Sequence, residues 1–174
     1  MLTEKMHRLP LPIIAAAIAL ATWFAVSPTD AASSKSSDQR FMNAAIQGDL
    51  EEVQMGKLAE EKGQGDSVKQ YGKMLEQDHS EHLQKAQQLA DKNGLKAPTE
   101  PNAKQRRAYE KLSGLSGGKF DAAFARDMVS DHQKDISKYR KEANSKSDLA
   151  DFAKQTVPVL QKHLQAAEAL TGKK

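Results

Sequence analysis

Apolar residues recur at every third or fourth position along four long stretches of this chain, which is the spacing of one buried face on an α-helix. Each stripe also carries a polar residue near the middle of its helix, where a carboxylate or an imidazole would face the interior. A shorter helix is expected after Pro98 and Pro101. The pattern predicts long helices over 38–62, 67–93, 119–144 and 148–170, and the short helix over 103–112.

The connections between the four long helices are short, long and short in turn. Residues 63–66 and 145–147 are tight turns, whereas 94–116 is too long for a simple hairpin. Two helical hairpins joined by one long crossover make a ferritin-like four-helix bundle, in which the second and third long helices run parallel. We therefore expect an all-α, ferritin-like four-helix bundle whose long crossover contains the short helix.

Two of the long helices carry the same dipeptide, Asp78-His79 in one and Asp131-His132 in the other. Each His falls on the helix face that is expected to be buried. Buried imidazoles and carboxylates cost free energy unless they are paired, so they are the first candidates for a functional site. The repeat also matches Tyr71 with Phe124 and Leu75 with Met128, eight and four positions before the His.

Folding each hairpin back on itself predicts which polar residues meet near the middle of the bundle. A turn centred at residues 64–65 places Glu52 beside 77–79, and a turn centred at 145–146 places His163 within about one helical turn of His132. Four helices therefore contribute one candidate each to a central cluster. The first candidates are Glu52, His79, His132 and His163, and the second-rank candidates are Glu76, Asp78, His82 and Asp131.

The cluster has a metal interpretation and a structural one. A di-iron carboxylate site needs Glu-x-x-His on two helices, but Val129 stands three residues before His132. Three His with Glu52 would instead suit zinc, copper or a single iron. In the structural interpretation each neutral ring donates to a carboxylate or carbonyl on a neighbouring helix. We favour the structural interpretation, with no cofactor, and keep a transition metal as the alternative.

The N-terminus has the order of a secretory signal peptide. Lys5 and Arg8 precede an apolar run over 11–26, and small residues lead to an expected cleavage after Ala31. The run is shorter than the ~20 apolar residues of a membrane span, so we expect no transmembrane segment after cleavage. The exported protein is expected in the periplasm, and association with the outer membrane is left open. The expected division is a signal peptide over 1–31, a flexible lead-in over 32–37 and the bundle domain over 38–174.

Composition excludes several classes of function. The net charge of +3 is spread evenly and aromatic residues make up only 5%, so nothing indicates a nucleic-acid partner. The chain has no Cys, which excludes a disulfide framework and a thiolate metal site. It also has no nucleophile elbow, phosphate loop or dinucleotide fingerprint. No protein partner is indicated, and a homodimer is left open.

Five short groups of residues spread over 38–170 carry a family resemblance. They are Phe41, Ala44, Ala45 and Gly48 ahead of 52–59; Val68, Lys69, Met74, Asp78 and His79; 112–114 with Phe120 and Asp121; Met128, Val129, Asp131 and His132; and Pro158, Leu160, His163 and Leu164. Together they resemble a large bacterial family of secreted ferritin-like bundles of unknown function, often labelled predicted outer-membrane or periplasmic proteins. The resemblance implies the bundle fold and export, and it implies no established activity.

These observations favour a non-enzymatic exported bundle, with a role in envelope stress or surface interactions and a structural His network. The first alternative is a metal-binding protein or oxidoreductase that uses Glu52, His79, His132 and His163. The second is a pH-responsive bundle, because protonation of clustered buried His near about pH 6 would loosen the packing. Ring nitrogens of the three His that meet at one point with Glu52 would favour metal, whereas rings that pair off separately with carboxylates would favour structure.

Overall fold

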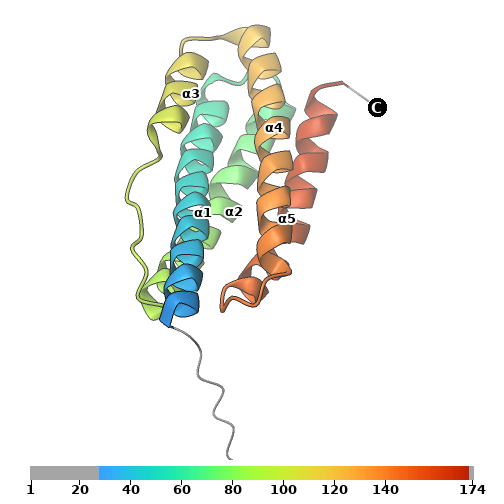
Figure 1. Ribbon diagram of the computed structural model, residues 1–174. Helices are drawn as coiled ribbons and strands as arrows, with labels where there is room; N and C mark the ends of the chain where they lie inside the picture. Colours follow the sequence, from blue (N-terminus) through green and yellow to red (C-terminus); the bar gives the residue numbers. More distant parts are fainter. Residues whose placement is uncertain (1–27, 173–174) are drawn as a thin grey trace, which may run out of the picture.

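The computed structural model describes residues 28–172, which form five helices and, within that range, no strand (Figure 1). Four long helices make a bundle, and the short α3 lies within the crossover between the second and third of them. The expected all-α four-helix bundle, with a crossover that contains a short helix, is thereby confirmed. The helices are α1 (Pro28–Lys62), α2 (Asp66–Lys92), α3 (Ala103–Ser113), α4 (Gly117–Ala143) and α5 (Ala150–Leu170).

The largest difference from the expected boundaries lies at the start of α1. The helix begins at Pro28 and not at Asp38, so residues 32–37 are helical and the expected flexible lead-in was wrong. The physical reason is that no Gly or Pro interrupts the sequence from 29 to 47, so the helix continues outward without a break. The predicted signal peptide over 1–31 lies almost wholly outside the described residues and stays a prediction. No helix within 28–172 is apolar over a length that could cross a bilayer.

The bundle is built from two antiparallel hairpins, α1 with α2 and α4 with α5, and α2 and α4 run in the same direction (Figure 1). Asp121 of α4 links the hairpins, because its two carboxylate oxygens accept hydrogen bonds from the backbone N–H groups of Gln64 and Gly65 at 3.0 and 2.9 Å. α2 stops at Asn93, followed by Gly94 at φ 61°, the left-handed conformation that ends a helix. The sequence had predicted this stop.

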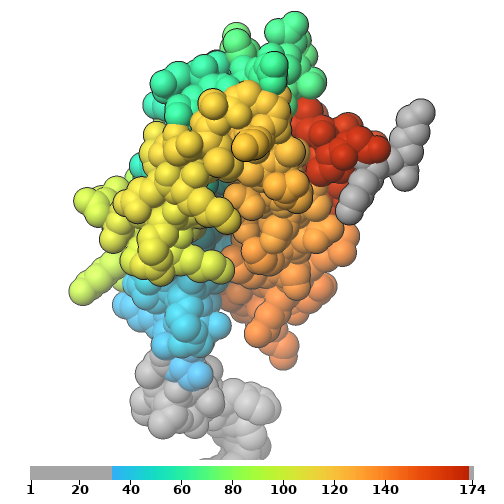
Figure 2. All heavy atoms as spheres, turned by 90° about the horizontal axis from the view of Figure 1, so that it is seen from above, coloured from blue at the N-terminus to red at the C-terminus, as the bar shows by residue number. Residues whose placement is uncertain are grey.

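The crossover is fixed to the outside of the bundle. A reciprocal cap begins α3, in which the Asn102 side chain accepts from the Gln105 N–H and the Gln105 side chain accepts from the Asn102 N–H. α3 packs against both α1 and α4, and Figure 2 shows its yellow surface beside that of α4 in orange. The crossover therefore covers one side of the α1–α4 interface.

Two glycines set the register between α1 and α2. A Cβ added to Gly56 would lie 2.6 Å from the carbonyl oxygen of Gly72, and a Cβ added to Gly72 would lie 2.6 Å from the carbonyl oxygen of Gly56. Only residues without side chains allow the two backbones to come this close. This contact fixes which residues of α1 and α2 lie opposite each other along the whole hairpin.

The interior consists of apolar packing on both sides of one polar layer. Towards the α1–α2 turn, the core is formed mainly by Met55, Leu58, Tyr71, Leu75, Phe120, Phe124 and Met128. Towards the other end it is formed mainly by Met42, Ile46, Ala86, Leu149, Ile136, Tyr139 and Leu160. Between these two regions each of the four long helices presents buried polar residues, namely Asp49, Glu52, His79, His132, Thr156 and His163. This layer is the candidate site.

Candidate metal centre

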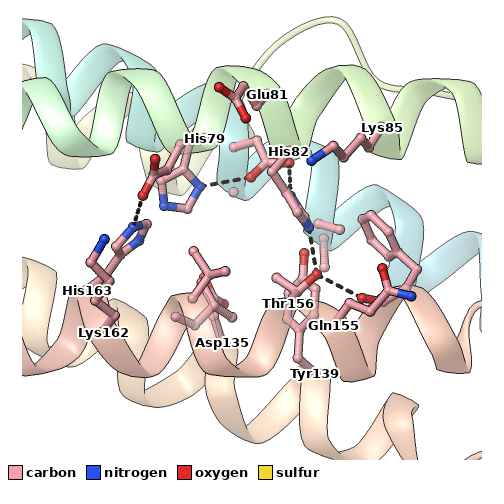
Figure 3. Close-up of a pocket in the computed structure, with 18 residues that line it drawn as sticks. His79, Glu81, His82, Lys85, Asp135, Tyr139, Gln155, Thr156, Lys162 and His163 are labelled. Atoms are coloured by element: carbon pink, nitrogen blue, oxygen red, sulfur yellow. Dashed lines mark hydrogen bonds and ion pairs between the residues drawn. The ribbon is translucent and has the colours of Figure 1, made fainter.

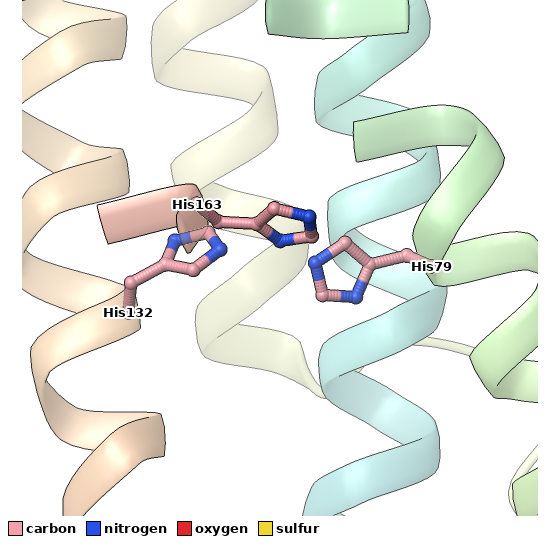
Figure 4. Close-up of side chains that lie close together, drawn as sticks. All are labelled: His79, His132 and His163. Atoms are coloured by element: carbon pink, nitrogen blue, oxygen red, sulfur yellow. The ribbon is translucent and has the colours of Figure 1, made fainter. Parts of the chain in front are cut away.

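Three imidazoles from three different helices converge in the polar layer (Figure 4). His79 comes from α2, His132 from α4 and His163 from α5, and each is at most 6% exposed. Their ring centroids are 5.2 to 5.9 Å apart. One ring nitrogen of each lies within 4.8 Å of those of the other two. Three of the four first-rank candidates are therefore brought together.

In each ring one nitrogen points into the cluster. The other nitrogen forms a hydrogen bond to an acceptor outside the cluster. The acceptor is a carboxylate in two cases and a backbone carbonyl in the third, all close to ideal hydrogen-bond length. The bonds are His79 Nδ1 to Asp49 Oδ1 at 2.9 Å, His132 Nδ1 to the Met128 carbonyl at 3.0 Å, and His163 Nε2 to Asp78 Oδ2 at 2.8 Å. Each ring is thus oriented by a partner outside the cluster.

These acceptors determine which nitrogen carries the proton. A carbonyl oxygen can only accept, so Nδ1 of His132 must be the N–H, and in the neutral ring Nε2 carries the lone pair. The carboxylate oxygens of Asp49 and Asp78 likewise act as acceptors, so His79 Nδ1 and His163 Nε2 are the N–H groups of the other two rings. The nitrogens left as acceptors are His79 Nε2, His132 Nε2 and His163 Nδ1, all of them buried and without a partner among the described residues. Three lone pairs therefore face one another with no donor between them.

The environment keeps two of these rings neutral. Burial, and then the neighbouring His79 and His163, lower the pKa of His132 to about 3. Burial also lowers the pKa of His163 to about 4, against an opposing hydrogen bond to Asp78. At neutral pH His132 and His163 consequently offer lone pairs and no positive charge, which is the state in which imidazole binds a metal.

Asp49 connects the cluster to a fourth imidazole. Its second oxygen, Oδ2, lies 2.7 Å from His82 Nδ1, and His82 Nε2 lies 3.0 Å from the hydroxyl of Thr156. Burial alone would raise the pKa of Asp49, but the hydrogen bonds from His79 and His82 outweigh it and hold the pKa below its usual range. Both nitrogens of His82 already have partners, so this second-rank candidate does not join the cluster. Its role is to hold Asp49 in place behind His79.

Glu52 is buried next to the cluster but its carboxylate does not join the group of three nitrogens. Its Oε1 lies 3.9 Å from Nδ1 of His132, the nitrogen already bonded to a carbonyl, and its Oε2 has no partner among the described residues. Burial raises the pKa of Glu52 well above its usual range, and nearby carboxylates, Asp135 first, raise it further. The buried hydroxyl of Tyr71 likewise has no partner there. A neutral Glu52 therefore lies beside the cluster and not in it.

The remaining second-rank candidates are divided between the site and the surface. Asp78 belongs to the site, since it accepts the hydrogen bond of His163. Asp131 instead forms an ion pair with Lys134 at 2.8 Å on the outer face of α4. Glu76 lies 3.5 Å from Lys57, also at the surface. Although the two Asp-His dipeptides match in sequence, only the first of the two Asp residues supports a His of the cluster.

Sequence reasoning missed Asp49. It had placed Glu52 beside 77–79, but a turn centred at 64–65 brings Asp49 at least as close to His79, and the contact of Gly56 with Gly72 has that same register. Asp49 lies three residues after Ile46 and three before Glu52, so it occupies the same inward stripe. That spacing and the position of the turn were the available signals.

A cavity of about 340 Å³ reaches the cluster from the side of the bundle where α2 and α5 face each other (Figure 3). His79 and His163 form part of its wall, and His132 does not. Figure 3 shows these two rings at one end of the cavity, with Thr156 and Tyr139 towards the other. The cluster is therefore buried within protein but adjoins a space that a small ligand can fill.

A sequence model of one protein family, described as a domain of unknown function (DUF4142), matches residues 25–170. The chain belongs to this family. The DUF4142 assignment confirms the expected class, a helical domain of unknown function, and supplies no activity. None of the curated proteins matches the chain.

A solved structure supports the fold of this DUF4142 domain. The crystal structure of a DUF305 fragment from Deinococcus radiodurans is similar with a TM-score of 0.68, covering 78% of this chain and 95% of that one. The two sequences are 15% identical, so the likeness concerns the fold alone. Any role for the His cluster must therefore be argued from its own chemistry.

Proposed function

We propose that this DUF4142 domain is an exported, ferritin-like bundle that binds one transition-metal ion through His79, His132 and His163. The observation that supports it is the convergence of three buried lone pairs whose rings are each fixed by a hydrogen bond from the opposite nitrogen. Metal-binding His residues characteristically donate their second N–H to a carboxylate or carbonyl in this way. A purely structural network would instead give each buried acceptor a donor.

The dimensions and the charge of the cluster suit a divalent ion. Metal–nitrogen bonds of about 2.0–2.1 Å would require the rings to close by less than about 1 Å from nitrogens that now lie within 4.8 Å of one another. Asp49 and Asp78 supply two carboxylates directly behind two of the ligands, which offset the charge of such an ion. Three imidazoles without thiolates favour zinc, copper or iron, and they leave a further coordination position for water or another ligand.

The proposed role is metal binding, and we do not propose an enzymatic reaction. Export is supported by the signal-peptide pattern of the first 31 residues, and the ferritin-like relationship by the order of short turn, long crossover and short turn. In the periplasm the bundle would hold its metal in a water-poor site reached through the side cavity.

Elemental analysis of the mature protein, purified without a metal-affinity tag, tests the proposal. We expect close to one metal ion per chain in the wild type and almost none in His79→Gln or His132→Gln. Asp131→Asn is the control, because Asp131 stands next to His132 on α4 and forms its ion pair with Lys134 at the surface. Circular dichroism would show whether each variant keeps its helices.

The result decides between metal and structure. A thermal midpoint that rises with added zinc, copper or iron in the wild type and in Asp131→Asn, but not in the two His variants, would support the site. Metal-free protein whose melting ignores all three ions would overturn the proposal and leave the His cluster as a structural feature of the core.

A further inference from the structure

The side cavity has room for more than a metal-bound water. Its volume of about 340 Å³ falls at the lower end of the range for small-molecule sites. Two of the unpartnered ring nitrogens, His79 Nε2 and His163 Nδ1, belong to residues of its wall. A ligand in the cavity can therefore reach the coordination position that three His ligands leave open.

The charges around the cavity favour an anion. Most lining carboxylates are already engaged, Asp49 by two His, Asp78 by His163, and Asp135 by Lys138 at 2.7 Å. The ammonium groups of Lys85 and Lys162, by contrast, have no ion-pair or hydrogen-bond partner within residues 28–172, and Glu81 is the only lining carboxylate there in the same condition. A neutral imidazole does not cancel the charge of a carboxylate, so Asp49 and Asp78 together offset a divalent metal ion. One positive charge is then left over once the metal is bound.

Much of the rest of the wall is apolar. Phe152, Val159 and Leu160 of α5 line the cavity together with Ala44 and Ala45 of α1. Phe152 also stacks on the ring of His82, with centroids 4.7 Å apart, so its position is fixed. A wall of this kind favours a ligand with a hydrocarbon part. An organic anion therefore fits the cavity better than phosphate does.

We propose that the cavity binds a small organic carboxylate, whose oxygen occupies the open position of the metal and whose hydrocarbon part lies against Phe152 and Leu160. Lys85 and Lys162 at the rim attract and retain the anion (Figure 3). This inference rests on the proposed metal site, because the metal supplies the strongest contact to the carboxylate.

Cobalt(II) provides the test, since its visible absorption responds to changes in its ligands. Protein loaded with Co(II) is titrated with benzoate, with acetate, with inorganic phosphate and with benzamide, the neutral counterpart of benzoate. We expect benzoate to change the spectrum saturably and to bind more tightly than acetate, because its ring buries apolar surface. Benzamide and phosphate are expected to leave the spectrum nearly unchanged.

Two double variants locate the effect. Lys85→Met/Lys162→Met should weaken benzoate binding about three- to tenfold, and less at high salt, as expected for exposed charges. Lys141→Met/Lys154→Met removes the same charge from residues that do not line the cavity, and should bind benzoate like the wild type.

Each outcome decides one of the two proposals. Protein that takes up no Co(II) would overturn the metal site and this inference with it. Bound Co(II) whose spectrum ignores benzoate would overturn the inference alone. Equal affinity for acetate and benzoate, unchanged in the Lys85→Met/Lys162→Met variant, would show a carboxylate on the metal without help from the cavity, and would also overturn it.

Discussion

Gly56 and Gly72 hold α1 and α2 in backbone contact, with each carbonyl oxygen 2.6 Å from the place that a Cβ on the other residue would take. Asp49 lies two turns before Gly56, and His79 lies two turns after Gly72. One close approach in the apolar half of the hairpin therefore sets the register at which Asp49 accepts the hydrogen bond of His79. The packing of the α1–α2 hairpin and the geometry of the His cluster therefore both depend on Gly56 and Gly72.

Replacement of Gly56 by Ala should therefore damage both stability and the site. The added methyl meets backbone atoms of α2 that cannot rotate away, so the helices must separate or slide. We expect a loss of about 1–3 kcal/mol in the free energy of unfolding, despite the better helix propensity of Ala. Chemical denaturation measures the loss, and metal titration of the folded variant should show weaker binding than in the wild type.

Gly114→Ala is the matched control for that variant. A Cβ at Gly114 would have its nearest neighbour at 3.6 Å, an ordinary contact, and the residue has a φ of −76° that Ala adopts freely. Its stability should stay within about 0.5 kcal/mol of the wild type. If Gly56→Ala proved as stable as Gly114→Ala, the glycine contact would not set the register.

The fold could be predicted from the sequence because its determinants are local. The 3.6-residue periodicity, the Asn93-Gly94 stop and the contrast between short and long connections depend on neighbouring residues alone. The start of α1 could not be predicted in this way, since residues 29–37 contain neither a clear stripe nor a helix breaker. Helix boundaries without a cap or a breaker are set weakly by sequence.

The site could be predicted only in part, because it depends on contacts between helices. The positions of His79, His132 and His163 on inward stripes brought three of the four first-rank candidates together. Asp49 and Glu52 lie one turn apart on the same stripe, and periodicity alone does not reveal which carboxylate contacts a His. Which side each imidazole presents depends on its hydrogen-bond acceptor, and no pattern in the sequence carries that information.

Asp49→Asn should weaken metal binding without abolishing it. The amide cannot supply the negative charge behind His79, and it no longer imposes the tautomer in which Nε2 is free. Loss of such a supporting group typically costs 10- to 100-fold in metal affinity, roughly. Competition against a chromogenic chelator measures the affinity. Asp131→Asn, on the outer face of α4 and paired with Lys134, should bind as tightly as the wild type, and equal affinities in both variants would contradict the role of Asp49.

The metal-free protein should lose stability as the pH falls from about 6.5 towards 4. The pKa of His132 is lowered to about 3 and that of His163 to about 4, below the value of about 6.5 for an exposed His. Between these values the unfolded chain binds protons that the folded chain excludes, so the free energy of unfolding decreases with falling pH. Urea denaturation in the presence of a chelator, at intervals from pH 7.5 to 4.5, should show a decrease of about 1–2 kcal/mol per pH unit.

A His132→Gln variant separates this effect from general acid sensitivity. It keeps His163, so its stability should decline about half as steeply over the same range. Saturating metal should raise the wild-type curve without changing this slope, because His132 and His163 already exclude protons in the folded protein over this range. Curves of equal slope for wild type and variant would contradict the assignment of the pH dependence to these buried imidazoles.

Glu52→Gln should change stability in the opposite direction with pH and leave metal binding intact. Burial, then the carboxylates of Asp135 and Glu51, raises the pKa of Glu52 well above its usual range, so the folded protein holds a proton that the unfolded chain releases above about pH 4.5. Wild-type stability is therefore penalised increasingly as the pH rises from about 4.5 towards the folded-state pKa, and the variant escapes this penalty. The advantage of Glu52→Gln over the wild type should accordingly grow as the pH rises above about 5, whereas Glu76→Gln, at the surface beside Lys57, should show no such growth.

Elemental analysis of Glu52→Gln should still find close to one metal per chain, because the carboxylate lies outside the group of three nitrogens. Loss of the metal from this variant, with its helices intact, would make Glu52 a ligand and contradict the three-His site.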